Sequence, residues 1–203
     1  MGFHAFQQSV LEHSSIPVAF IPLRGEQRDG TNVFTYERFR IPLGDFCGPA
    51  IFADASDMLC RADIAELLSL YDETKAVQVV KHSYQTKHPR KYVGTEMESP
   101  NESYPRKNWS SLILWNAGHK AHVRAAEKLR GYDGAYLHRF AWLDDEQIGE
   151  LPAQWNHLVG EQDYDPGAKL CHFTVGIPGF THYAHCDYAD EWRDAVRKSQ
   201  RGL

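Results

Sequence analysis

The sequence predicts an α/β fold in which helices flank a mostly parallel sheet. Short apolar runs that are typical of buried strands alternate with helical stretches, and this alternation favours such a sheet. The 203 residues, 42% hydrophobic and 24% charged, suffice for one globular domain and exclude a disordered chain. We therefore expect residues 1–203 to form a single domain with a polar tail at 193–203.

The first part of the chain contains both kinds of pattern. Apolar residues at helical spacing predict an amphipathic helix over 3–13. The apolar run 16–23, which contains prolines near both ends, is typical of a buried strand, and a helix is expected over 35–43. A further short buried strand is predicted at 49–53, followed by a helix over 62–68.

The remaining elements are spaced more widely along the chain. Apolar β-branched residues predict a strand at 77–81, and another buried strand follows at 111–115. An alanine-rich helix is expected over 119–129, a last strand at 170–175, and a polar helix at the C-terminus. The polar segment 86–106 is a loop of about 20 residues, a length that is usually functional or mobile in a compact domain.

Charge and composition exclude several classes of protein. Lys and Arg number 22 and Asp and Glu 27, and this net charge of −5 argues against binding to nucleic acid or anionic lipid through overall charge. No apolar run approaches the roughly 20 residues of a membrane span, and the N-terminus lacks a secretory signal pattern. None of the four cysteines lies in a CxxC pair, so we expect reduced thiols and a cytoplasmic location.

Acidic residues directly follow the strand predicted at 49–53. Ligands of such sheets bind at the carboxyl ends of the strands, where Asp54 and Asp57 lie and where His172 can join them. Two close carboxylates are unfavourable unless a cation neutralises them, and these ligand types suit Mn²⁺ or Mg²⁺. The alternative is structural: one aspartate caps the next helix and the histidine packs in the core. No GxGxxG, GxxxxGK[ST] or GxSxG motif is present.

The string FADASDML at 52–59, followed by DIAEL at 63–67, resembles the metal-binding strand end of nucleotide-sugar glycosyltransferases. The nearest resemblance is to glycosyltransferase family eight, the class of glycogenin and lipopolysaccharide galactosyltransferases, and uncharacterised bacterial and phage relatives look closer still. The latter resemblance rests on further strings, which begin at Val79, Pro105, Leu151 and Asp187. The resemblance to nucleotide-sugar glycosyltransferases implies a GT-A-like, Rossmann-like fold. The first nucleotide-binding strand of that fold is expected to be lacking here, because the chain begins inside the first helix.

The resemblance also implies roles for individual residues. Asp54, Asp57 and His172 would hold Mn²⁺ or Mg²⁺, although the family motif is Asp-x-Asp and this chain has Asp-x-x-Asp. Three residues match positions near the donor, namely Arg38, Asn108 and Gly176. The family's Lys-Pro-Trp, which holds the diphosphate, is replaced by Ile177-Pro178-Gly179, so Lys107 or Arg106 is expected to supply the charge.

Two functions are compatible with these patterns. The first is a metal-dependent glycosyltransferase that moves a sugar from a nucleotide-diphosphate sugar, a UDP-sugar by preference, to a hydroxyl acceptor with retention of configuration. The acceptor is a glycan, a protein or a modified nucleic acid, and no oligomeric state is indicated. Asp144 and Asp145 are candidates for contact with the acceptor or the anomeric centre; the alternative is that both are exposed loop acids. The second function is that of a truncated, catalytically impaired relative that acts as a binding module.

Overall fold

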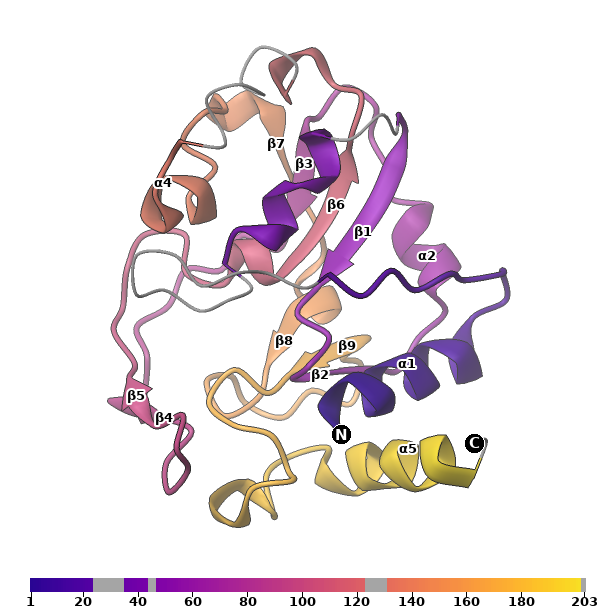
Figure 1. The fold of residues 1–203 in the computed structure, drawn as a ribbon, viewed down its shortest axis with the longest axis vertical. Coiled ribbons are helices and arrows are strands. Elements are labelled where there is room, and N and C mark those ends of the chain that lie inside the picture. Colours follow the sequence, from indigo (N-terminus) through magenta and orange to yellow (C-terminus); the bar gives the residue numbers. More distant parts are fainter. Residues whose placement is uncertain (24–34, 44–46, 123–130, 202–203) are drawn as a thin grey trace.

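A computed structural model describes residues 1–23, 35–43, 47–122 and 131–201. Its centre is a four-stranded sheet (Figure 1) of β1 (Pro49–Ala53), β6 (Leu112–Asn116), β3 (Val77–Val79) and β7 (Ile148–Glu150), in that order. A second sheet contains β2 (Met58–Cys60), β9 (Leu170–His172) and β8 (His157–Leu158). A small hairpin pairs β4 (Arg90–Lys91) with β5 (Ser99–Pro100).

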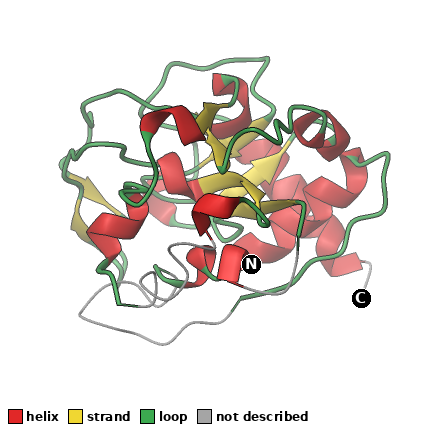
Figure 2. Cartoon of the chain, turned by 90° about the horizontal axis from the view of Figure 1, so that it is seen from above, coloured by secondary structure: helices red, strands yellow, loops and turns green. Residues whose placement is uncertain are grey.

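Four α-helices and six 3₁₀ helices belong to the described ranges. The α-helices are α1 (Gly2–His13), α2 (Ile64–Leu68), α4 (Gly134–His138) and α5 (Ala189–Arg201). The 3₁₀ helices are η1 (Glu37–Phe39), η2 (Ile41–Leu43), η3 (Trp109–Ser111), η4 (Asp145–Gln147), η5 (Ala153–Asn156) and η6 (Thr181–Tyr183). Seen from above, strands occupy the centre with helices around them, and one further small pair of strands lies at the left edge (Figure 2), so the predicted α/β class with flanking helices is confirmed.

The sheets are mixed rather than mostly parallel. In the larger sheet, β6 is antiparallel to both β1 and β3, and β3 is parallel to β7. In the smaller sheet, β9 is antiparallel to β2 and parallel to β8. The alternation of strand and helix patterns does not reveal this, because strand direction depends on which distant segments pair.

Three apolar clusters form the core. One contains Phe39, Trp115 and Phe140 and lies on the side of the larger sheet that η1 covers. A second contains Phe6 and Val10 of α1 together with Met58 and Leu170 of the smaller sheet. In the third, Trp192 of α5 packs with Ala5 of α1 and with Leu59 and Phe173. α1 and α5 therefore lie side by side (Figure 1) and cover the smaller sheet from below.

Several predicted elements differ in the structure. Residues 16–23 are extended but form no strand, and Ile21 is 81% exposed, because Pro17 and Pro22 cannot donate to a sheet. The predicted helix 35–43 is two 3₁₀ turns, since Pro42 disfavours helical continuation through Ile41.

Other expectations differ only in extent. The last strand ends at residue 172, and the expected polar tail is helical through residue 201 as part of α5. In the predicted helix 119–129, residues 120–122 are helical and the rest lies outside the described residues. None of the helices described is long and apolar enough to cross a membrane. The four cysteines are unpaired in the structure.

Candidate donor and metal site

The two aspartates predicted to bind metal lie where the chain passes from one sheet to the other. The backbone leaves β1 at Ala53, turns through Asp54 and Asp57, and enters β2 at Met58. The Asp57 carbonyl accepts a hydrogen bond of 2.8 Å from the Phe173 amide, and Met58 pairs with His172. The antiparallel pairing of β2 with β9 is therefore what brings residue 172 beside residue 57, across more than half of the chain.

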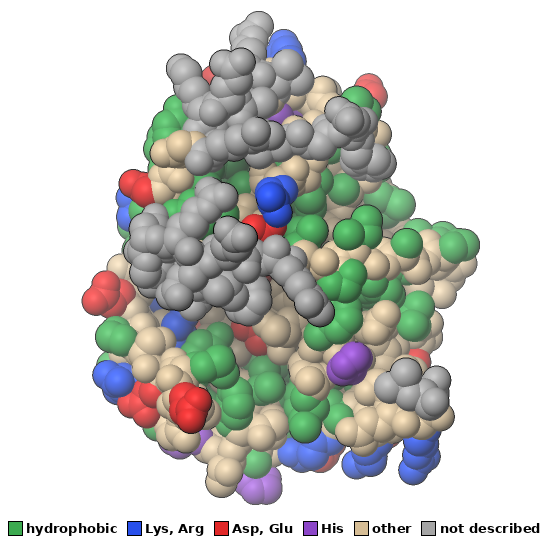
Figure 3. All heavy atoms as spheres, viewed as in Figure 1, with side chains coloured by type: hydrophobic (Ala, Val, Ile, Leu, Met, Phe, Trp, Pro, Cys, Tyr) green, Lys and Arg blue, Asp and Glu red, His purple; other side chains and the backbone are tan. Residues whose placement is uncertain are grey.

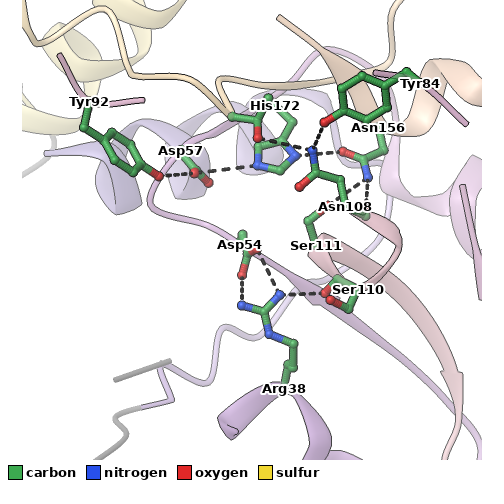
Figure 4. Close-up of polar contacts among 11 residues, drawn as sticks. Arg38, Asp54, Asp57, Tyr84, Tyr92, Asn108, Ser110, Ser111, Asn156 and His172 are labelled. Atoms are coloured by element: carbon green, nitrogen blue, oxygen red, sulfur yellow. Dashed lines mark hydrogen bonds and ion pairs between the residues drawn. The ribbon is translucent and has the colours of Figure 1, made fainter. Parts of the chain in front are cut away.

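Asp57 and His172 face each other in the interior (Figure 4). His172 Nε2 lies 3.6 Å from Asp57 Oδ2, and His172 Nδ1 lies 3.1 Å from Asn156 Oδ1. The amide of Asn156 is oriented by its Nδ2 group, which donates to Asn108 O and to Ser111 Oγ. Since an amide oxygen only accepts, Nδ1 of His172 carries the hydrogen and Nε2 turns towards the carboxylate.

The second oxygen of Asp57 is buried without a hydrogen-bond partner among the described residues. A buried carboxylate oxygen with no donor is costly and requires an explanation. Tyr92 Oη, the nearest other polar group at the carboxylate, donates to Oδ2 over 3.5 Å. The negative charge of Asp57 therefore has little compensation, and the position beside it suits a cation.

Asp54 has a different environment from Asp57. Arg38 NH1 lies 3.1 Å from Asp54 Oδ2 and Arg38 NH2 lies 3.0 Å from Oδ1, so both carboxylate oxygens contact one guanidinium. The same NH1 donates to Ser110 O at 2.8 Å, and the guanidinium lies over the Phe52 ring. Burial raises the pKa of the Asp54 carboxyl, and the positive charge of Arg38 acts in the opposite direction.

The predicted metal ligands therefore do not meet as a set of three. Within the described ranges, no three His, Cys, Asp or Glu side chains form a group that could hold a metal ion. Asp57 and His172 fit the ion as two ligands, one oxygen and one nitrogen, with the unpartnered oxygen available. Asp54 is engaged by Arg38 instead, and this pair places the arginine at the end of β1.

Asn108 lies at this site, whereas Lys107 points away from it. Asn108 has a left-handed backbone (φ 63°), and its Nδ2 donates to Tyr84 Oη at 2.9 Å and to Thr174 Oγ1 at 3.2 Å. The Lys107 ammonium donates to Asn101 Oδ1 and to the Glu102 carbonyl, each at 2.5 Å. Burial lowers the pKa of Lys107.

The other charges proposed near the donor have structural partners. Arg106 forms an ion pair with Asp145, donates to the Arg139 carbonyl and stacks on Trp109. Asp144 caps η4, and its own amide is capped by Gln147 Oε1 at 3.0 Å. The Asp145 side chain is 80% exposed. These contacts are those of surface acids that cap a helix and pair with arginine.

Gly176 contributes space rather than a contact. A Cβ atom at this position would lie 2.2 Å from the Tyr183 ring, so only glycine allows the ring to cover the backbone here. Tyr183 Oη in turn accepts from the Val93 amide at 3.0 Å, and Tyr92 donates its amide to Val175 O at 2.7 Å. Gly176 thereby lets the segment after β9 hold the loop that contains Tyr92.

The buried carboxylate of Glu161, which the sequence analysis did not identify, holds the long loop through hydrogen bonds. Glu161 accepts from Thr86 Oγ1 at 2.5 Å, from the Lys87 amide at 2.7 Å and from Asn101 Nδ2 at 3.2 Å. Tyr92 was also missed, and its left-handed backbone (φ 56°) is rare for a tyrosine. No local pattern marks either residue; Asn156 stands in a string that carried the resemblance, which was a usable signal.

Comparison with known proteins places this chain in a family. No protein-family model matches it. It is 38% identical to Protein CDI of Arabidopsis thaliana over 219 residues, which cover 98% of this chain and 82% of that protein. The chain belongs to the Protein CDI family.

Solved structures similar to this Protein CDI family member are glycosyltransferases. The bifunctional glycosyltransferase WbbM matches 96% of this chain with a TM-score of 0.64 and 17% identity. The apo form of GlyE from Streptococcus pneumoniae also matches 96% of this chain, with a TM-score of 0.57 and 14% identity. This chain spans 47% of the WbbM chain and 50% of the GlyE chain. The galactosyltransferase LgtC, solved with donor and acceptor sugar analogues, matches 87% of this chain and 70% of its own, with a TM-score of 0.51 and 12% identity.

These likenesses concern the fold. The predicted GT-A-like fold of glycosyltransferases is confirmed for this member of the Protein CDI family. Its placement in glycosyltransferase family eight, and its kinship with bacterial and phage chains, stay predictions.

Proposed function

We propose that this Protein CDI family member is a metal-dependent glycosyltransferase. It transfers a sugar from a nucleotide-diphosphate sugar, a UDP-sugar by preference, to a hydroxyl group of an acceptor, with retention of configuration. The fold shared with WbbM, GlyE and LgtC supports glycosyl transfer in general. The acceptor class stays open between a glycan, a protein and a modified nucleic acid.

The observation that carries the proposal is the pairing of Asp57 with His172. One oxygen of Asp57, Oδ1, is buried without a donor among the described residues, and the other, Oδ2, lies 3.6 Å from Nε2 of His172, whose Nδ1 faces Asn156. This is the arrangement that a metal-ligating histidine needs, because the second-shell hydrogen bond sets its tautomer. The mixed oxygen and nitrogen pair favours Mn²⁺, with Mg²⁺ as the second choice.

The protein residues around this pair orient the donor. Asp57 and His172 would hold the cation, which would supply positive charge to the diphosphate and to the leaving phosphate. Arg38, fixed by Asp54 and by Ser110 O, presents a buried and oriented cation at the end of β1. Asn108 and Tyr92 lie across from Arg38 in Figure 4 and carry an amide and a hydroxyl.

A donor screen tests the proposal. Purified protein is incubated with UDP-, GDP- and ADP-sugars and Mn²⁺, and release of nucleoside diphosphate is measured. Asp57→Asn and His172→Gln are each expected to lower turnover by at least 100-fold while the protein stays folded. Asp163→Asn is the matched control, because the Asp163 side chain is fully exposed. Full turnover in either site variant would overturn the metal assignment.

A second candidate function is that of a binding module, and the Arg38–Asp54 pair is the observation that favours it. Since Arg38 occupies both oxygens of Asp54, Asp57 and His172 are left as the two protein ligands. Such a site can bind a metal nucleotide without turning it over. Calorimetric titration with UDP and Mn²⁺ separates the two functions: metal-dependent binding without product in the donor screen supports the module, and product supports the enzyme.

A further inference from the structure

We propose that Lys91 is the residue that binds the diphosphate group of the donor. This inference rests on the proposed function and extends it, because it assigns a role to a residue of the long loop that neither the sequence motifs nor the comparisons single out. The anionic ligand class follows from the charges around Lys91.

The other basic residues of the loop already have partners. Arg90 Nε lies 2.5 Å from Glu98 Oε1, and Lys87 Nζ lies 3.4 Å from Asp163 Oδ1. Arg106 pairs with Asp145, and Lys107 donates to two neutral oxygens inside the protein. Among the described carboxylates, none lies within ion-pair distance of Lys91.

The backbone directs Lys91 to the same side as Tyr92. Neighbouring residues of a strand point to opposite faces, and Arg90 accordingly turns to Glu98. Tyr92 leaves the strand with a left-handed backbone (φ 56°), so the alternation is broken and the Lys91 ammonium lies 5.5 Å from the centre of the Tyr92 ring. Tyr92 Oη lies 3.5 Å from Asp57 Oδ2, so Lys91 is next in the chain to a residue that contacts the candidate metal ligand.

Three cations surround this region. The positive charge of Lys91 reaches both His138 and Lys107: burial is the main cause that lowers the pKa of each, and Lys91 lowers both further. Arg38 is the other cation near His138, whose pKa falls to about 3, so the imidazole is neutral. Arg38 is balanced by Asp54, and the charges of Glu161 and Glu102 act on Lys107 against the repulsion from Lys91, but Lys91 itself forms no ion pair among the described residues. An anionic ligand would relieve this repulsion.

The left-handed tyrosine supplies an independent reason to expect a function at this hairpin. A non-glycine residue with positive φ costs free energy and persists where the surroundings hold it in place. The Tyr92 amide donates a hydrogen bond to Val175 O, and the Tyr92 carbonyl accepts one from Thr95 Oγ1. The Phe180 ring packs edge-on against the Tyr92 ring. The protein maintains this strain at the point that carries Lys91 and the Asp57 contact.

Pyrophosphate is the probe that tests Lys91 without assuming the nucleotide base. Its affinity for the full chain is measured by calorimetric titration with Mg²⁺ present, for the wild type, Lys91→Ala, Lys91→Arg and Arg90→Ala. Loss of a charge-assisted contact is expected to weaken binding by about 10- to 100-fold in Lys91→Ala. Arg90→Ala removes the same charge from the adjacent position and is expected to change affinity by less than about 2-fold, because Arg90 faces Glu98. Lys91→Arg is expected to retain most of the affinity.

The outcomes separate this inference from the proposed function. Equal affinity of Lys91→Ala and the wild type, or no binding of pyrophosphate to the wild type, would overturn the role of Lys91 whatever the donor screen shows. A selective loss in Lys91→Ala without turnover of any sugar nucleotide would keep the anion site and remove the transferase. Equal loss in Arg90→Ala and Lys91→Ala would also overturn the inference, since it would reduce the effect to net charge.

Discussion

His172 Nδ1 faces the amide oxygen of Asn156 at 3.1 Å, and this contact turns His172 Nε2 towards Asp57. Asn156 comes from η5 and His172 from β9, so the tautomer of the histidine is set by an element 16 residues away. The contact is buried, and the Asn156 amide is itself oriented by donation to Ser111 Oγ at 2.9 Å. Asn156 is therefore a positioning residue for the candidate ligand.

Removal of the Asn156 side chain is expected to weaken metal binding. Asn156→Ala should lower the affinity for Mn²⁺ in the presence of UDP by about 10- to 100-fold, as loss of second-shell partners does in metal sites. The measurement is calorimetric titration with MnCl₂. Ser111→Ala is the control, because it removes one contact of Asn156 but leaves the contact with His172. Unchanged Mn²⁺ affinity in a folded Asn156→Ala protein would contradict the positioning role.

The Arg38–Asp54 pair is expected to matter for stability. The side chains are 9% and 23% exposed, and Asp54→Asn leaves a largely buried guanidinium without its counter-charge. We expect a loss of about 2–4 kcal/mol in the free energy of unfolding, measured by urea denaturation. Asp190→Asn breaks the pair of Arg193 with an almost fully exposed carboxylate and should change stability by less than about 0.5 kcal/mol. If the Asp54→Asn variant lost as little stability as the Asp190→Asn control, Arg38 would have found another partner.

Glu161 is expected to control the mobility of the long loop. Glu161→Ala removes the acceptor shared by Thr86, Lys87 and Asn101 and leaves these donors without a partner. We expect about 1–3 kcal/mol of destabilisation, with faster hydrogen exchange confined to residues 84–104. Hydrogen-exchange mass spectrometry makes the measurement, and Asp163→Ala, which removes an exposed acid two residues away, is the control. Exchange that rises equally throughout the chain would instead indicate global destabilisation.

His122 is expected to make the protein less stable in acid. This fully buried imidazole contacts Ala76 O through Nε2 at 3.0 Å, and Trp142 Nε1 donates to its Nδ1 over 3.4 Å. Burial lowers the pKa of His122 from 6.5 to about 4. The unfolded chain therefore binds a proton between these values that the folded chain does not, so stability is full above pH 6.5 and falls as the pH drops towards 4.

The size of the His122 effect is set by one proton. Near pH 5, the His122→Asn variant should show a pH slope of the unfolding free energy that is smaller by about 1 kcal/mol per pH unit than that of the wild type. Urea denaturation at several pH values between 4 and 7 measures both slopes. His182→Asn, on the part-exposed η6, is the control and should leave the slope unchanged. Identical slopes in His122→Asn and the wild type would contradict a buried neutral imidazole at position 122.

The partners of the charged side chains could not be predicted from sequence patterns. The loop acids, Asp144 and Asp145, and the basic residues, Arg106 and Lys107, all occur in segments without periodicity, so their partners could not be predicted. On the face shown in Figure 3, acidic, basic and apolar side chains are interspersed rather than gathered into one basic patch. Which of these charges meets an opposite charge and which stays unpaired depends on the approach of distant segments.

The sequence by itself determined several of the strands and helices and the residue types at the strand ends. Apolar runs placed β1, β3, β6 and β9 to within a few residues, and the helix predicted over 62–68 is α2. Hydrophobic periodicity is a local property, so it can be recognised from the sequence alone. Asp54, Asp57 and His172 were singled out in the same way, because each lies at or next to the end of a strand.

Only the tertiary structure decided how those residues combine. The pairing of β2 with β9 joins Asp57 to His172, the bidentate contact with Arg38 withdraws Asp54 from the set, and at the left-handed turn of Tyr92 the Lys91 ammonium lies near the Tyr92 ring. Each of these relationships is a contact between segments far apart in the chain, or a backbone conformation that such contacts enforce. Their free energies arise from burial and charge pairing in the folded state, and no local pattern of residues records them.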